Sequence, residues 1–174
     1  MIRAIVYNSN SGFTRQYAEI LSKKIGLPMY SLKEAKKTLD KHDGIIFLSW
    51  IMAGSIVKIK KASKYSIKAI VAVGMTYDEK QEKELTKKMA IYNPELLINV
   101  QGGFFMDRLK GIYKFMMGSL RSVMLKGLTE KENKTEQDEQ LLLMMTKGAS
   151  FVNEENLKRV IEWYFNKEGQ IWEK

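Results

Sequence analysis

The stretch VYNSNSGFTRQYAEIL, residues 6–21, joins an apolar segment to an amphipathic one through a loop rich in hydroxyl groups. Residues 2–7 form a short apolar run typical of a strand buried in a parallel sheet. From residue 14 to residue 25, apolar side chains recur at the spacing of one helix face. The sequence therefore predicts a strand, a tight loop and a helix at the start of the chain.

The predicted loop carries more hydroxyl groups than a turn requires. Ser9, Ser11 and Thr14 surround Gly12, although a plain turn needs only the glycine and one capping residue. The start of a helix attracts anions because its first backbone N–H groups are free, and a glycine lets the backbone approach a ligand closely. The loop has no lysine or arginine before Thr14, so it is not a Walker-type loop, which carries Gly-Lys-Ser/Thr. This pattern favours a site for a terminal phosphate over a simple helix cap.

Strand and helix patterns alternate along the rest of the chain. Further strands are predicted at residues 28–32, 45–48, 68–74 and 96–100, and further helices at 78–91 and 156–165. Strands separated by helices imply right-handed crossovers and a parallel sheet covered on both faces. Five strands suit one α/β domain, residues 1–174, with strand order 2-1-3-4-5 and ligand loops at the carboxyl ends of the strands.

The composition excludes several kinds of site. The chain has no cysteine, and its one histidine, His42, cannot form a histidine-based metal site, so we interpret it as a surface loop residue. No apolar run approaches the roughly 20 residues of a membrane span, and no signal peptide is evident, so we expect a cytoplasmic protein. The net charge of +9 is compatible with an anionic membrane or an acidic partner, or with lysines spread over a solvated surface. No motif for nucleic-acid binding accompanies that charge, so we expect no nucleic-acid partner.

The loop Ser9-Asn10-Ser11-Gly12-Phe13-Thr14, with a strand before it and a helix after it, resembles the [Ser/Thr]-x-[Ser/Thr]-Gly-x-Thr phosphate loop of flavodoxins. The resemblance implies a flavodoxin-like three-layer αβα sandwich and FMN as the cofactor, with its phosphate held by this loop. It also implies that the loops after the third and fourth strands hold the isoalloxazine ring. The matching positions are Ser49, Trp50, Ile51, Met52, Ala53 and Gly54 in the first loop, and Gly74, Met75, Thr76, Tyr77 and Asp78 in the second.

The chemistry of these two loops suits a flavin. Trp50 and Tyr77 offer aromatic surfaces on which a flat ring can stack. Small residues such as Ala53 and Gly54 would let backbone N–H groups reach the pyrimidine edge of the ring. The alternative for Trp50 is a core position at the end of a strand.

After the fifth strand, residues 107–128 and the later apolar segment resemble the helical insert of flavodoxin-like, menaquinone-linked protoporphyrinogen oxidases. We place this insert at about 105–150; the resemblance implies a quinone- or porphyrin-like substrate. One helical stripe is predicted, and it consists of Leu109, Ile112, Tyr113, Met116, Leu120, Val123 and Met124. It is flanked by Arg108, Lys110, Lys114, Arg121 and Lys126. The stripe would lie on an anionic membrane, form a soft wall for an apolar substrate, or pack on the domain's own sheet. Residues 129–140 are predicted to be an exposed connector.

Three classes of function remain open. The first is an FMN-dependent oxidoreductase acting near a membrane, with a peripheral position at its inner face. The second is a flavodoxin-type electron carrier, against which the charge of +9 argues because carriers of that type are acidic. The third is a basic, flavin-free module, against which the intact set of loop hydroxyls argues. We expect the first.

Overall fold

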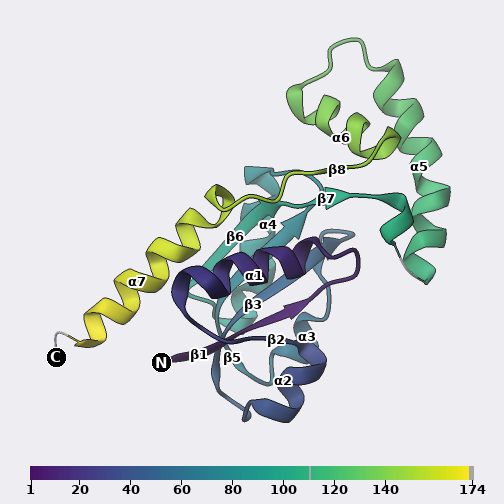
Figure 1. Cartoon of the computed structure of the whole chain (residues 1–174). Helices are drawn as coiled ribbons and strands as arrows, with labels where there is room; N and C mark the ends of the chain where they lie inside the picture. Colours follow the sequence, from purple (N-terminus) through teal and green to yellow (C-terminus); the bar gives the residue numbers. More distant parts are fainter. Residues whose placement is uncertain (110, 173–174) are drawn as a thin grey trace.

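The computed structural model describes the backbone of residues 1–109 and 111–172, and side chains as far as Lys167. A parallel sheet of five strands forms its centre, in the order β2-β1-β3-β5-β6 (Figure 1). The strands are β1 (Ile2–Asn8), β2 (Met29–Ser31), β3 (Gly44–Met52), β5 (Ser66–Gly74) and β6 (Leu96–Gln101). The α/β fold and the predicted strand order 2-1-3-4-5 are confirmed.

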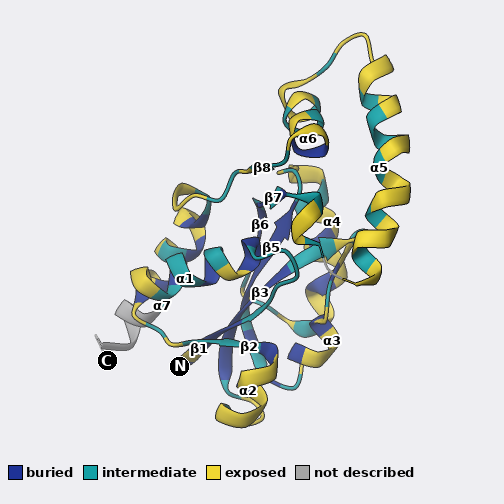
Figure 2. Ribbon diagram, turned by 45° about the vertical axis from the view of Figure 1, so that its right-hand side comes forward, coloured by how far each residue is buried: buried dark blue, intermediate teal, exposed yellow. Residues whose placement is uncertain are grey.

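Helices cover both faces of the sheet. The first face is covered by α1 (Phe13–Ile25) and α7 (Lys158–Trp172), and the second by α2 (Leu32–Thr38), α3 (Ile59–Ala62) and α4 (Glu79–Met89). Successive strand residues point to opposite faces, so Ile46 and Leu48 pack under α1 while Ile45 and Phe47 pack under the second set. The strands are accordingly the most buried part of the molecule (Figure 2).

Some predicted boundaries were wrong. The prediction ended the third strand at residue 48 and made residues 49–54 an open loop, whereas β3 continues to Met52. Ala53 and Gly54 both have positive φ, 47° and 66°, so the chain reverses in two residues. The short strand β4 (Ser55–Ile56) then pairs with β3 in the antiparallel sense. The predicted loop is therefore the end of a hairpin.

The insert forms a helical hairpin beyond the carboxyl end of the sheet (Figure 1). Short strands β7 (Gly103–Phe104) and β8 (Ala149–Ser150) pair at its base, and it contains the 3₁₀ turn η2 (Met106–Arg108) and the helices α5 (Ile112–Glu130) and α6 (Glu136–Thr146). Most of the predicted connector 129–140 is helical, because Thr135 and Asp138 form a capping box that starts α6. Two further 3₁₀ turns, η1 (Ala90–Tyr92) and η3 (Glu155–Leu157), follow α4 and precede α7.

Within the described residues, no helix is both long enough and apolar enough to cross a bilayer. The expected cytoplasmic location stays a prediction.

Candidate functional site

The loop between β1 and α1 has the geometry of an anion site. Gly12 is the N-cap of α1 and has φ 99° and ψ −21°, a conformation that side chains with a Cβ rarely adopt. A Cβ built on Gly12 would meet no atom within 4 Å, so the glycine is required by its backbone conformation and not by crowding. The space on the Cβ side of Gly12 is therefore open beside the first turn of α1.

One side-chain donor of this loop has no acceptor among the described residues. The N-cap of α1 is a glycine and so has no side chain to cap the helix, and the Gly12 N–H donates to Ser9 Oγ at 3.1 Å. Asn10 Nδ2 is buried and has no hydrogen-bond partner among the described residues. An unpaired buried donor is unfavourable by about 1–3 kcal/mol, and an anion bound at the loop would relieve that penalty once the amide turns toward it. The loop therefore fits a phosphate group better than it fits a closed helix cap.

The strand ends bring the predicted loops to one edge of the sheet. Asn8 of β1 lies beside Ser49 of β3, and Trp50 lies beside Val73 of β5. The last residue of β5, Gly74, pairs in turn with the end of β6. The phosphate loop and the two predicted ring loops therefore follow neighbouring strands.

Ser49 holds the base of the hairpin in place. Its side chain is fully buried; Ser49 Oγ accepts from Asn8 Nδ2 at 3.1 Å and donates to the Val57 carbonyl at 2.7 Å. Both hydrogen-bonding directions of the hydroxyl are used within the protein. Its side chain is thus a structural link between β1 and the segment after β4.

Trp50 lies at the edge of the site and not in the core. It is half-buried, and it follows Leu48 and Ile46 on the strand, so the alternation of the strand directs it to the α1 face. The phosphate loop opens α1 on that same face. The ring of Tyr113, from the first turn of α5, contacts the Trp50 ring edge-on, with centroids 4.9 Å apart and planes at 90°. The sequence assigned Tyr113 only to the helical stripe and gave no signal for this contact.

The second predicted ring loop is held by glutamines. Residue 74 must be a glycine, because a Cβ there would lie 2.9 Å from the Thr76 carbonyl oxygen. Gln101 Nε2 donates to the Met75 carbonyl at 3.3 Å, and Gln137 Nε2 of α6 donates to the Tyr77 carbonyl at 2.8 Å. The side chain of Tyr77 is free to meet a ligand, since this residue is 41% exposed.

A family model described as a flavodoxin domain matches residues 4–132. The chain belongs to the flavodoxin domain family. The match includes the phosphate loop, both predicted ring loops and α5, and it ends before α6. No curated protein matches the chain. Flavodoxin domains typically bind FMN and serve in redox reactions, which makes FMN the cofactor to test against this site.

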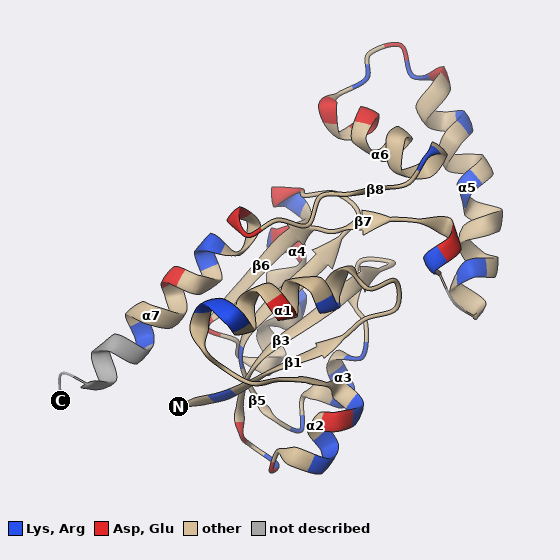
Figure 3. Ribbon diagram, in the orientation of Figure 1, with Lys and Arg blue, Asp and Glu red and all other residues tan. Residues whose placement is uncertain are grey.

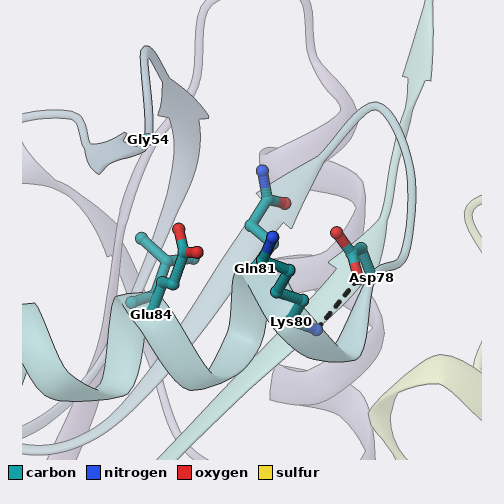
Figure 4. Close-up of a pocket in the computed structure, with 6 residues that line it drawn as sticks. Gly54, Asp78, Lys80, Gln81 and Glu84 are labelled. Atoms are coloured by element: carbon teal, nitrogen blue, oxygen red, sulfur yellow. Dashed lines mark hydrogen bonds between the residues drawn. The ribbon is translucent and has the colours of Figure 1, made fainter.

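A polar cavity of about 240 Å³ lies beside the hairpin turn of this flavodoxin domain (Figure 4). Its lining consists of Gly54, Asp78, Lys80, Gln81, Glu84 and Leu85. It borders both ring loops but contains no residue of the phosphate loop and no aromatic side chain. Lys88 Nζ donates to the Gly54 carbonyl at 2.9 Å and ties the turn to α4. We interpret this cavity as the space under the hairpin and not as the place of a stacked ring.

The insert of this flavodoxin domain does not pack on the sheet. No residue of α5 is buried, and its inner side, with Met117 and Met124, packs on the small core around Phe104, Met144 and Met145. This core belongs to the insert itself, and a cavity of about 200 Å³ lies next to it. The alternative in which the stripe packs on the domain's own sheet is therefore wrong.

The predicted stripe divides between two sides of α5. Leu109, Tyr113 and Met124 point inward, whereas Ile112, Met116, Leu120 and Val123 are exposed. Two of the flanking cations interact with other groups of the insert. Arg121 Nε donates to the Met145 carbonyl at 2.6 Å, and the Arg108 guanidinium lies 4.2 Å from the centroid of the Phe105 ring. Lys110 lies outside the described residues.

Proposed function

We propose that this protein is an FMN-dependent oxidoreductase that acts on a flat, apolar substrate of the quinone or porphyrin class. The observation that carries the FMN assignment is the first turn of α1, with its glycine N-cap, the open space beside Gly12 and the unpaired Asn10 amide. These features match what a terminal phosphate requires. Membership of the flavodoxin domain family supports the same cofactor.

The phosphate would be held by the whole loop, which consists of Ser9, Asn10, Ser11, Gly12, Phe13 and Thr14. The isoalloxazine would lie among residues at and just after the carboxyl ends of β3 and β5, which are Trp50, Ile51, Met52, Ala53, Gly54, Gly74, Met75, Thr76 and Tyr77. When bound, FMN would supply the redox chemistry, by exchange of electrons or a hydride with the substrate. The protein would then contribute binding, orientation and exclusion of water.

Tyr7 and Tyr17 lie near the site but are not bases at neutral pH. Burial raises the pKa of Tyr7 and of Tyr17 above the ordinary value, so both phenols stay neutral at neutral pH. The Tyr17 hydroxyl instead donates to the Gln101 carbonyl and accepts from Asn156 Nδ2 at 2.5 Å. These bonds fix the end of β6 beside the site.

The insert favours an enzyme over an electron carrier. Its Tyr113 touches Trp50, and its glutamines Gln137 and Gln140 reach the second ring loop directly or through Gln101. A carrier needs an exposed ring edge for its partner proteins. A wall built against the ring site would instead admit only small molecules. The side chains nearest this wall are apolar or soft, with Met75, Met106 and Met117 among them.

The test is the anaerobic reoxidation of chemically reduced, FMN-loaded protein. Tyr113→Ala should slow reoxidation by a lipid-soluble quinone and leave reoxidation by ferricyanide, a small hydrophilic acceptor, unchanged. Phe165→Ala, on the distant helix α7, is the matched control and should change neither rate. Equal quinone rates in the parent and in Tyr113→Ala would contradict a substrate wall and favour the carrier.

A further inference from the structure

The positive charge of the chain is concentrated in one segment. Residues 33–68 contain nine lysines and three acidic residues, so they contribute +6 of the total charge of +9. The lysines are Lys33, Lys36, Lys37, Lys41, Lys58, Lys60, Lys61, Lys64 and Lys68. A uniform spread of surface lysines would not give this distribution.

Eight of these lysines lie on α2, on α3 or in the segments beside them, and the ninth, Lys68, lies in β5 (Figure 3). All but Lys64 and Lys68 are exposed. Leu32 and Ala35 of α2 join Ile59 and Ala62 of α3 in one buried cluster, so the charged sides of both helices face outward. Among the salt bridges of the described residues, Lys68 alone of the nine lysines takes part, with Glu95 at 3.9 Å. The remaining eight are not neutralised by a carboxylate.

The outer side of α5 is an exposed apolar face. It consists of Ile112, Phe115, Met116, Leu120 and Val123. Phe115 is 78% exposed and Val123 is 69% exposed, values unusual for large apolar side chains on one helix face. At 100° per residue the five positions fall within one arc of the helix. Among the charged residues of α5, Lys126 and Glu130 share this arc, and they pair with each other at 4.0 Å.

The apolar face and the lysine surface lie on the same side of the molecule. Figure 2 shows α5 above α3 on the right-hand side of the molecule, with α2 below them, and α1 and α7 on the left. The start of α5 is also held against the sheet, because Tyr113 touches Trp50 at the end of β3.

We propose that this side of the protein docks on an anionic lipid bilayer, with the apolar face of α5 at the acyl boundary and the α2–α3 lysines at the headgroups. A helix with an exposed apolar face gains free energy when that face enters the interface, and nearby lysines add attraction to anionic lipid. A second copy of the chain is a poorer partner, because its lysine surface would repel an identical one. An acidic protein would match the lysines but not the apolar row on α5.

One consequence rests on the proposed function. Tyr113 lies at the ring site, and its neighbour Ile112 is exposed on the apolar face. A substrate dissolved in lipid would therefore reach the site along α5 without crossing water. Docking itself does not depend on FMN and is tested without it.

The experiment is co-sedimentation of the cofactor-free protein with vesicles of phosphatidylcholine containing about 30% phosphatidylserine, at low salt. Phe115→Gln should weaken binding roughly tenfold or more, whereas Phe165→Gln on α7 makes the same chemical change and should have no effect. Lys60→Gln with Lys61→Gln should weaken binding roughly twenty-five-fold, at about fivefold per lysine. The control for charge is Lys23→Gln with Lys158→Gln, on the α1 and α7 side, which should bind like the parent.

Each outcome decides the proposal. Binding that falls in the two test variants, holds in their controls and weakens in high salt would support it. A parent protein that ignores anionic vesicles would overturn it, and so would equal losses in test and control variants. Binding that depends on the lysines but not on Phe115 would show a purely electrostatic surface and reject docking through α5. A dimer that Phe115→Gln dissociates, without vesicle binding, would assign the face to a second copy. FMN affinity measured separately keeps this result distinct from the proposed function.

Discussion

Replacing Thr14 with valine should separate ligand binding from helix capping. Thr14 is the second residue of α1 and is 2% exposed, and its hydroxyl makes no hydrogen bond to another described residue. Valine keeps the shape, so loss of an unpaired hydroxyl should leave the cofactor-free protein as stable as the parent or slightly more stable. A hydrogen bond from this hydroxyl to a charged phosphate contributes about 1.5–3 kcal/mol, so FMN should bind about ten- to a hundredfold more weakly.

The assay is a calorimetric titration of the cofactor-free protein, with a urea denaturation curve for stability. Riboflavin lacks the phosphate, and its affinity should be nearly the same for Thr14→Val and the parent. Thr86→Val is the matched control, because the Thr86 hydroxyl bonds the Glu82 carbonyl on the exposed helix α4. Unchanged FMN affinity together with lower stability would refute the reasoning and identify Thr14 as a structural residue of the helix.

Three other changes test separate parts of the structure. Trp50→Leu should abolish most of the tryptophan quenching that FMN causes, and a quenching amplitude equal to that of the parent would remove Trp50 from the ring site. The Lys131 ammonium, together with hydrogen bonds from Thr135, lowers the pKa of Asp138 to about 2. The folded pKa lies below the ordinary value near 3.9, so the contribution of this cap is complete above about pH 4 and is lost as the pH falls toward 2. Protection of the α6 amides, measured as the exchange rate relative to the intrinsic rate at each pH, should fall over that range in the parent but not in Asp138→Asn. Gly148→Ala should destabilise the insert by about 2–4 kcal/mol in urea unfolding, because φ is +78° there and a Cβ would lie 2.3 Å from the Phe105 ring; an unchanged midpoint would contradict this.

The central fold could be predicted because its signals are local. The longer parallel strands are rich in apolar residues, and the loop before α1 is recognisable from the spacing of its hydroxyls and glycine. The short helices α2 and α3 were missed, since each buries only two side chains and no long periodic pattern exists. The hairpin after β3 was missed because Ala53-Gly54 is not one of the usual pairs for a two-residue turn.

Only those parts of the candidate site that lie at the ends of strands could be predicted. The phosphate loop and the ring loops come from the order of strands, which fixes which loops are neighbours. The contact of Tyr113 with Trp50 could not be predicted, because it depends on how the insert is placed against the end of β3. The same holds for the hydrogen bond from Arg121 to the Met145 carbonyl. This bond holds inside the insert a guanidinium that the sequence predicted on the flank of an exposed stripe.

The visible absorption spectrum of the purified protein tests the central claim most directly. The account predicts flavin bands that dithionite bleaches, and release of FMN, identified by its mass, when the protein is denatured. A colourless preparation should gain the same bands after incubation with FMN and removal of free ligand. A protein that stays colourless after that treatment would contradict the assignment of the α1 loop as a phosphate site.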